Sequence, residues 1–599
     1  MKKDELQLFY TSLQQQNAEK KHYYKRKTSA NAILRLVIFV ATAIAFYYSL
    51  KTEIWIVFAL LFTATLVFVA LVQYSAKLDK KRRWHKELEA IYGEELDTIN
   101  GNFKAFDGGD KFKAPTHSFS YDLDIFGQDG FFQTINRTTR PGGTKKLATQ
   151  ITTPLLEQSA IERRQQAFQE LAANDEWRQA YKAHGRIHKL IEDDDTILKN
   201  LHEQNLKVPK WAFSKIVYIG VPVLTITTIV LSSISIIPVG YPILAILIQW
   251  AITGILFKTT QQADASTGKT NKIMAGQKEL IRAIKTKKWE SQLLIELQQK
   301  LLSENGNALE AVDQLARIMF NFEYRNNLII NMIINSILLW DIQCLSRFYK
   351  WHQKSSHHFN LWMETLDTMD AWVSCGGYVQ NNPDFTTPKI TLEYQLNSTE
   401  LGHPLLPASK RITNDYRLDK GTSFHIVTGA NMAGKSTFLR TVSLNMAMAM
   451  SGLPVCAKSF EFMPVNIFTS MRTTDSLSKD ESYFYAELRR LREAYDRIKN
   501  GERLFIVLDE ILKGTNSEDK RKGSMDFLKQ LVKYNVSGII ATHDTQLSEL
   551  EELHPEIFRN YCFEIEIDGD NIQFDYKLLP GVTRTMNAQL LMKQMGLIG

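Results

Sequence analysis

Long apolar stretches interrupt an otherwise mixed sequence, and they come in two closely spaced pairs. The first pair covers residues 33–50 and 54–72, and the second covers residues 216–237 and 241–257. The run at 54–72 carries no charge, and as a helix it would span about 28 Å, close to the ~30 Å hydrocarbon core of a bilayer. The pattern therefore predicts four transmembrane helices arranged as two hairpins.

Basic residues flank both pairs on their outer sides. They cluster at 20–27 and 77–83 around the first pair, and around the second pair they are Lys207, Lys210, Lys215 and Lys258. Because positive flanks stay in the cytoplasm, we expect a multi-pass protein of the cell's inner (cytoplasmic) membrane with its soluble domains in the cytoplasm. The late, doubled apolar region argues against a cleaved signal peptide. Buried helices of a soluble protein are the alternative.

The remaining sequence separates into a helical part and a part with short strands. Residues 84–207 and 259–387 have mostly helical patterns, and from about Pro388 the pattern is that of short strands and turns. A chain of 599 residues is too long for one core, so we expect several domains. The division is 1–83 (basic segment and first hairpin), 84–207, 208–258 (second hairpin), 259–387 and 388–599.

A further apolar stretch, Leu328 to Trp340, is a candidate for a fifth span. It is only thirteen residues long, whereas a spanning helix requires about 20, and Asn331 and Asn335 fall on one helical face at i, i+4. The pattern favours a buried helix of the soluble body.

Composition adds few constraints. The net charge of +7 permits nucleic acid or anionic lipid as a partner but demands neither. The four cysteines are far apart and lack the spacing of metal ligands, which indicates reduced thiols without a disulfide framework.

The strongest chemical motif is Gly429–Ser436, which fits the phosphate-binding pattern G-x-x-x-x-G-K-[ST]. An apolar, β-branched run precedes it at 424–428, and a helical continuation follows at 437–442. Glycines let successive backbone N–H groups face phosphates at a helix start, Lys435 supplies positive charge, and the Ser436 hydroxyl is a ligand for Mg²⁺. The predicted ATP-binding residues are Gly429, Ala430, Asn431, Met432, Ala433, Gly434, Lys435, Ser436 and Thr437.

Two later strands end in polar residues suited to hydrolysis. The run 504–508 ends in Asp509-Glu510, and the run 538–542 ends in His543. At the carboxyl ends of parallel strands these side chains would meet the phosphate loop. Asp509 is predicted to hold Mg²⁺, Glu510 to orient or deprotonate the attacking water, and His543 to contact the γ-phosphate. With Lys435 as the third catalytic residue, this set predicts an ABC-type ATPase.

Four blocks then resemble one family. They are Thr428–Thr437 with its Asn431-Met432 pair, Asp475–Leu488, Asp509–Asn516, and Ala541–His543, and together they are similar to the MutS family of DNA mismatch-repair ATPases. Further upstream, Arg140–Arg164 resembles the start of the MutS lever. The resemblance implies a C-terminal α/β P-loop ATPase domain, an all-α lever/core region, a homodimer and DNA as a partner. It also implies that Ser482 begins a helix that contacts the partner's γ-phosphate in trans.

Three departures from the family accompany this resemblance. A membrane hairpin stands where a mismatch-reading domain would precede the lever, so we expect that domain to be lacking. The second hairpin interrupts the lever where MutS extends its DNA clamp. Asp480 replaces a glycine, and its carboxylate would repel a neighbouring phosphate unless it points away.

The function predicted is therefore a membrane-anchored, dimeric MutS-like ATPase that couples ATP binding and hydrolysis to lever movement on DNA. An ABC-like motor for membrane transport or remodelling without DNA is the alternative. Against transport, the apolar spans carry no ionisable residue at their centres to mark a substrate path. A non-catalytic tether is a third possibility, against which the intact Lys435, Asp509 and Glu510 argue.

Overall fold

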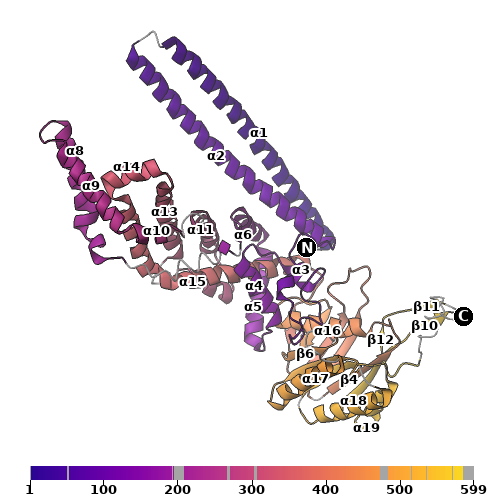
Figure 1. Cartoon of the computed structure of the whole chain (residues 1–599). Helices are drawn as coiled ribbons and strands as arrows, with labels where there is room; N and C mark the ends of the chain where they lie inside the picture. The colour runs from indigo at the N-terminus through magenta and orange to yellow at the C-terminus, as the bar shows by residue number, and fades with distance from the viewer. Residues whose placement is uncertain are drawn as a thin grey trace.

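Two helical projections and an α/β unit at the opposite end make up the molecule (Figure 1). The computed structural model describes residues 2–49, 53–191, 193–194, 208–265, 270–302, 307–421, 423–472, 483–513, 516–534, 536–568 and 571–584. The predicted boundary at residue 207 lies outside these ranges.

The first projection is a long antiparallel pair, α1 (Lys3–Ser49) and α2 (Ile54–Ile99). The predicted spans form its outer half, where apolar side chains such as Phe39 and Phe62 are exposed. The inner half is polar and closes on a small core that includes Tyr10 and Tyr92. By length and composition, both helices could cross a membrane.

The second projection follows a short turn η2 (Lys210–Phe213). It consists of a π-helical turn η3 (Ile216–Gly220), α8 (Val221–Ser233) and α9 (Gly240–Ile255). Ile216–Ser233 is long and apolar enough to cross a membrane, whereas α9 is apolar but shorter. The chain leaves α9 at Leu256 and enters α10 (Phe257–Ala265), which shortens the helix predicted at 241–257.

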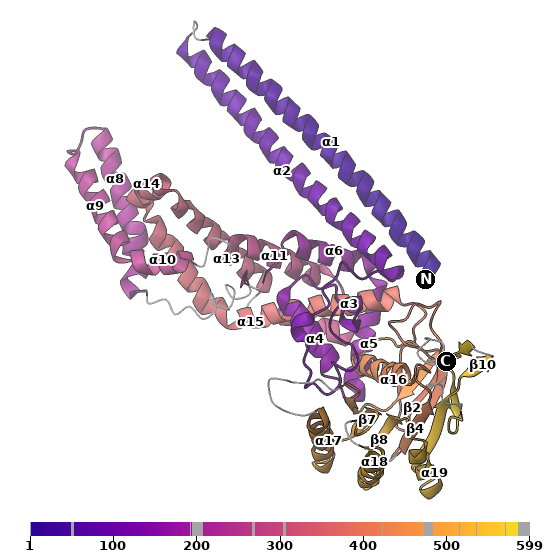
Figure 2. The ribbon, with the colours of Figure 1, turned by 45° about the vertical axis from the view of Figure 1, so that its right-hand side comes forward.

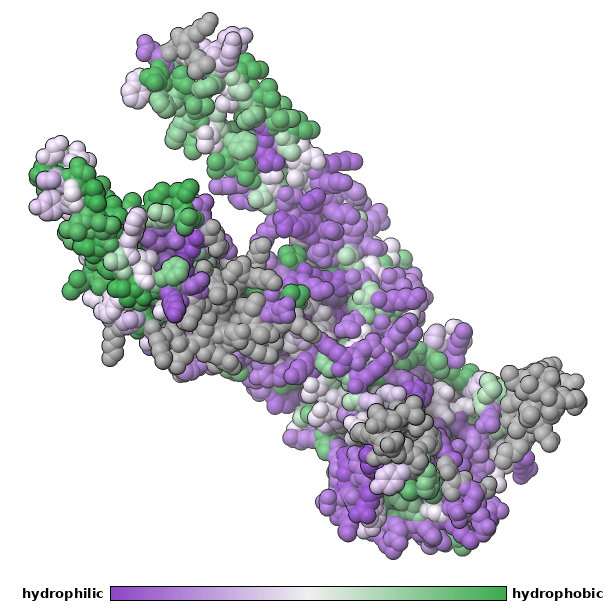
Figure 3. Space-filling view, in the orientation of Figure 1, coloured by the Kyte–Doolittle hydropathy of each residue, from purple (hydrophilic) through white to green (hydrophobic). Residues whose placement is uncertain are grey.

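The helix α14 (Leu328–Leu338) corrects the sequence-based interpretation. We expected a buried helix of the soluble body, but Leu328 is 72% exposed and Ile329 is 70% exposed. Only Asn335 is buried within it. The helix turns its asparagines toward the protein and its apolar residues outward, and it meets α15 (Trp340–Asn381) at a bend of 81°. Its surface joins the apolar surface of α8 and α9 (Figure 3).

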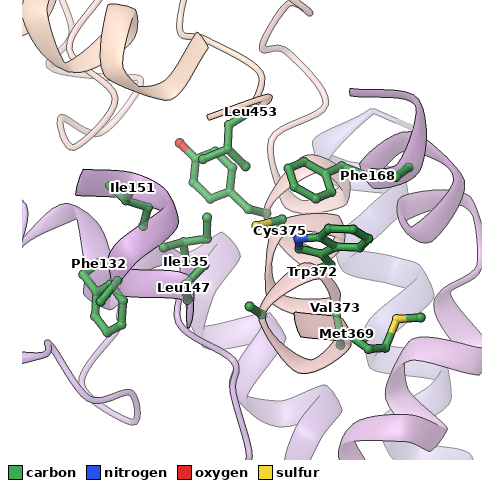
Figure 4. Close-up of a cluster of buried hydrophobic side chains, with 14 of the residues drawn as sticks. Phe132, Ile135, Leu147, Ile151, Phe168, Met369, Trp372, Val373, Cys375 and Leu453 are labelled. Atoms are coloured by element: carbon green, nitrogen blue, oxygen red, sulfur yellow. The ribbon is translucent and has the colours of Figure 1, made fainter. Parts of the chain in front are cut away.

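The helical body is built around α15, which packs against α4 (Pro141–Thr152), α5 (Gln158–Ala173) and α13 (Ala308–Glu323). Phe132, Trp372 and Leu453 belong to the core that this body shares with the α/β unit (Figure 4). The remaining helices of the body are α3 (Phe131–Ile135), α6 (Asp175–Ile187), α11 (Thr270–Thr286), α12 (Gln292–Lys300) and η4 (Tyr324–Asn326).

Residues 100–130 differ from the helical expectation, because only the short turn η1 (Asp110–Phe112) is helical there. Glycines allow the chain to fold tightly on itself. A Cβ at Gly108 would lie 2.3 Å from the backbone oxygen of Gly127, so this contact requires glycine. The segment nevertheless contributes buried residues, including Phe119 and Ile125, to the main core.

The α/β unit contains a four-stranded sheet in the order β1-β5-β2-β3 and a six-stranded sheet in the order β12-β9-β4-β8-β7-β6. The strands from β9 to β6 run parallel, and β12 is antiparallel. The strands are β1 (Lys389–Ile390), β2 (Tyr394–Leu401), β3 (Asn414–Asp419), β4 (Ser423–Gly429), β5 (Ser459–Phe462), β6 (Asn466–Ser470), β7 (Leu504–Asp509), β8 (Ser537–Ala541), β9 (Phe558–Phe563) and β12 (Leu578–Pro580), with β10 (Glu566–Asp568) and β11 (Asn571–Gln573) as a separate pair.

Helices cover the six-stranded sheet (Figure 2). They are α16 (Lys435–Met450), α17 (Tyr483–Lys499), α18 (Ser517–Leu531), η6 (Thr545–Ser548) and α19 (Glu549–Leu553). Every residue of β4 and of β8 is buried, as expected of inner strands in a sheet covered on both faces. Because β4, β8 and β7 are neighbours, their carboxyl ends meet at one edge of the sheet.

Candidate functional site

The loop between β4 and α16 has a backbone that only particular residues permit. Met432 and Gly434 have positive φ angles of 66° and 105°. A Cβ at Gly434 would lie 3.0 Å from the ring of Tyr576, and one at Gly429 would lie 2.9 Å from the carbonyl oxygen of Phe563. Both glycines of the motif are therefore needed for the loop to curl, and α16 begins directly after it at Lys435.

The loop borders a cavity of about 700 Å³ that also receives the ends of β7 and β8. Asn431 to Thr437 line one side, and Asp509, Glu510 and His543 line it as well. The strand ends are tied together, since the backbone N–H of Glu510 donates to Ala541 O at 2.9 Å and that of Thr542 donates to Val427 O at 3.0 Å. The structure thus brings the sequence-predicted residues of the loop and of both strand ends to one cavity.

Lys435 lies at the centre of this site and is buried. Its Nζ donates to the carbonyl oxygens of Gly429 at 2.8 Å and Ala430 at 2.9 Å. Burial lowers its pKa to about 8, although the nearby carboxylates Asp509 and Glu510 favour the charged form. The ammonium group is therefore held by carbonyls that a phosphate could replace.

His543 lies on the other side of Lys435, with Nδ1 3.5 Å from Nζ. Burial and then the charge of Lys435 lower the pKa of His543, so the neutral imidazole is the stable form at pH 7. A neutral ring whose Nδ1 faces an ammonium carries its proton on Nε2, which leaves that nitrogen as a hydrogen-bond donor.

Glu510 lies on a constrained loop after β7. Its φ is +60°, as is that of Leu512, and its carboxylate pairs with Lys520 Nζ at 3.3 Å. Glu487 of α17 supports this loop by accepting the backbone N–H groups of Leu512 at 2.7 Å and Lys513 at 3.0 Å. Burial raises the pKa of Glu487. Sequence reasoning placed Glu487 inside a family block but gave it no role.

Other sequence-predicted residues are less well defined by the structure. Ser482 and Asp480 lie outside the described residues, so the trans contact stays a prediction. Among the described residues, no group of three or more His, Cys, Asp or Glu side chains could hold a metal ion. A hydroxyl from Ser436 and a carboxylate from Asp509 nevertheless line the same cavity and are of the oxygen type that Mg²⁺ prefers.

The cavity also has lining residues that sequence reasoning missed. They come from the loop before β3 and from the segment before β12, and include His403, Leu406, Ile412, Asn414 and Tyr576. Asn414 joins these two parts, since its side chain donates to Tyr576 O at 3.1 Å and accepts from the backbone N–H of Leu578 at 2.8 Å. No local sequence signal marks these residues, because the two parts are distant in the sequence and belong to strands of different sheets.

Comparison with known proteins identifies the part of the chain that carries this cavity. Residues 425–590 match the MutS domain V family. Curated relatives named DNA mismatch repair protein MutS include those of Thermotoga petrophila (33% identity, covering 30% of this chain and 23% of that protein), Persephonella marina (32%, covering 33% and 23%) and Methanosarcina acetivorans (30%, covering 37% and 25%). The matches span about a quarter of the length of these relatives. The C-terminal portion of this chain therefore belongs to the MutS family.

Proposed function

We propose that the chain is a Mg²⁺-dependent ATPase that is anchored in a membrane, acts as a homodimer and transmits its nucleotide cycle to the helical body. The observation that carries the ATPase proposal is the single cavity lined by Lys435, Asp509, Glu510 and His543. MutS relatives are named for DNA mismatch repair, and this supports DNA as the partner on which the body acts.

Each side chain of the cavity suits one part of phosphoryl transfer. The γ-phosphate would replace the carbonyls of Gly429 and Ala430 as the partner of Lys435 Nζ. The negative charge of the phosphate would favour the protonated amine. Ser436 and Asp509 would hold Mg²⁺, which neutralises charge on the phosphates. Glu510 would orient and deprotonate the attacking water, and the Nε2–H of His543 would bind the γ-phosphate.

Transmission to the helical body is supported by residues 116–124, which follow the membrane hairpin in the chain. The Asp122 carboxylate accepts the hydroxyl of Thr469 at 2.6 Å and the backbone N–H groups of Met471 at 3.1 Å and Arg472 at 3.0 Å. All three donors lie at the end of β6. The segment is therefore fastened directly to the sheet of the ATPase unit.

The same segment is held by α17. The guanidinium of Arg490 donates to the carbonyl oxygens of Thr116, His117 and Ser118 at 3.2, 2.7 and 2.8 Å. Residues 473–482, where the family resemblance puts the trans contact, lie in the chain between β6 and α17. Both flanks of that stretch thus contact the segment that leads to the hairpin, which supports coupling between nucleotide and body.

A buried ion cluster joins α2, the second helix of the first hairpin, to the helical body. Glu95, near the end of α2, accepts Lys182 Nζ at 2.6 Å, Arg137 Nε at 3.2 Å and Asn381 Nδ2 at 2.6 Å. Burial lowers the pKa of Lys182 to about 8, opposed by the charge of Glu95. Since α2 runs without interruption from Ile54 to Ile99, movement at this cluster would pass into the hairpin.

Membrane anchoring is supported by the exposed apolar side chains on both projections (Figure 3). A second candidate function, membrane remodelling without DNA, is favoured by one observation. The apolar hairpin α8–α9 stands at the far end of the helical body (Figure 1), so that movement of this body would act on the bilayer.

One set of measurements tests these proposals. The ATPase rate of the full chain in lipid nanodiscs is compared with that of Lys435→Ala, without DNA and with homoduplex, mismatched and branched DNA. We expect turnover that requires Lys435; turnover equal in the variant would refute the assigned site. Absence of both DNA stimulation and salt-dependent DNA binding would leave the remodelling alternative. Release of the chain from membranes by carbonate would refute anchoring by spanning helices.

A further inference from the structure

The bend that precedes α15 is held by several polar contacts. Leu339, at the bend, has a left-handed backbone with φ 48°, which is strained for a leucine. The Gln249 side chain of α9 accepts the N–H of Leu339 at 3.2 Å, and Asn335 Oδ1 accepts the N–H of Asp341 at 2.9 Å. Such strain persists only where surrounding groups fix it. The direction of α14 is therefore determined by the fold.

The polar side of α14 faces the protein. Asn335 donates to Asn331 and is almost completely buried. Next to them, Ser336 Oγ accepts the indole N–H of Trp250 at 2.8 Å, which joins α14 to α9. Trp250 is itself partly exposed. Tryptophan with its N–H satisfied and its ring at the surface is typical of the boundary between lipid and water.

Apart from Ser336, which bonds to α9, the adjacent side of α14 is apolar, and among the described residues it is exposed. Leu328, Ile329, Met332 and Ile333 are all exposed, and their positions place them on one helical face. We call this set the α14 apolar face. In water such a contiguous surface is unfavourable, and it continues directly onto the exposed surface of α8 and α9 (Figure 3).

The position of α14 in the molecule points to lipid as the occupant. In Figures 1 and 2 the tip of α8–α9 reaches as far along the direction of the α1–α2 axis as the tip of α1–α2 itself. One flat bilayer can therefore contain both tips. In both views α14 lies crosswise below the tip of α8–α9. A helix of 11 residues, about 16 Å long, is too short to span the bilayer.

We propose that α14 lies in the plane of the membrane interface, with its apolar face in contact with lipid acyl chains. This proposal rests on the proposed membrane anchoring. It makes α14 a third lipid contact of the molecule, beside the two hairpins. Three contacts would fix the height and rotation of the helical body on the bilayer. Interfacial helices bind in this way when one face is apolar and the other is polar.

The test is spin-label accessibility on the full chain in nanodiscs of phosphatidylethanolamine and phosphatidylglycerol. Labels are placed at Ile329→Cys and Ile333→Cys. Phe62→Cys, in the first hairpin, and Leu553→Cys, in α19, are matched controls, because both native side chains are exposed, at 67% and 58%. The native cysteines are buried, and labelled unmodified protein gives the background. The ratio of collisions with oxygen to collisions with a water-soluble nickel complex reports lipid contact.

We expect ratios at residues 329 and 333 several-fold above that at residue 553 and below that at residue 62. A ratio equal to that at residue 553 would show that α14 is in water and would refute the proposal. Low collision rates with both reagents would show a protein partner, such as a second copy of the chain, and would also refute it. If the label at residue 62 is itself in water, the membrane anchoring fails and the α14 proposal fails with it.

Discussion

Asp122→Asn isolates the connection between the six-stranded sheet and the segment at 116–124. In the native chain Asp122 Oδ2 accepts from Thr469 and Met471, and Oδ1 accepts from Arg472. An asparagine must place its NH₂ group at one of these positions. The Thr469 hydroxyl can turn to accept, but the N–H of Met471 or of Arg472 then loses its acceptor. The substitution thus removes one charge-assisted hydrogen bond from a buried site.

The magnitude follows from that bond. A hydrogen bond to a charged group contributes about 1.5–3 kcal/mol, so the opening equilibrium of the segment should rise about 10- to 150-fold. The N–H groups of Leu123 and Ile125, which bond to Phe119 O at 3.0 Å and Ser120 O at 3.1 Å, report that opening. Hydrogen exchange followed by mass spectrometry on the full chain in nanodiscs measures it.

The matched control is Asp129→Asn, which removes the same charge from an exposed position of the same loop. Its backbone φ of 60° is one that asparagine accepts readily. Peptides from α18 serve as an internal reference for the rest of the α/β unit. Exchange in 118–125 that stays within twofold of this control would refute the reasoning, because Asp122 would then not fasten the segment.

Three further outcomes are expected. Glu510→Gln should retain ATP binding but lose turnover by at least about 100-fold, measured by phosphate release; unchanged turnover would remove Glu510 from its role. Because the pKa of Lys435 is about 8 and phosphates bind its charged form, nucleotide affinity should be constant below pH 8 and fall up to about tenfold per pH unit above it. A fluorescent ATP analogue measures this, and a flat profile to pH 9.5 would contradict it. Glu95→Gln, which leaves two buried cations without their carboxylate, should destabilise the body by about 3–5 kcal/mol in pulse proteolysis, whereas Glu89→Gln in the partly exposed pair with Lys21 should change stability by at most about 1 kcal/mol.

The sequence was informative wherever local rules act alone. The strands expected at 424–428, 504–508 and 538–542 are present as β4, β7 and β8, because buried parallel strands need continuous apolar residues. Their adjacency could also be anticipated, since phosphate-loop and acidic strand ends have to meet to do chemistry. The loop at Gly429–Gly434 follows from the backbone that its glycines permit.

The sequence was misleading where the surroundings of an element determine its role. For α14 the pair Asn331 and Asn335 was correctly placed on one face, but periodicity does not say which face meets protein and which is exposed. For residues 100–130, glycine contacts such as Gly108 with Gly127 replace helix. Tyr576 lines the cavity and Glu487 supports the loop after β7 through contacts between residues distant in sequence, which no local pattern records.

The contacts that hold residues 116–124 combine specific side chains with backbone groups, which are present whatever the sequence. The bonds from Arg490 to residues 116–118 all end on backbone oxygens, so this contact does not constrain the sequence of that segment. Asp122 likewise accepts two backbone N–H groups and a single hydroxyl. Specific side-chain pairs also hold the segment, because Asp124 pairs with Arg472 and Arg440, and Ser118 Oγ accepts from Arg497. If nucleotide repositions residues 473–482, the end of β6 and the start of α17 move with them, and the segment that leads to the membrane hairpin has to follow or be released.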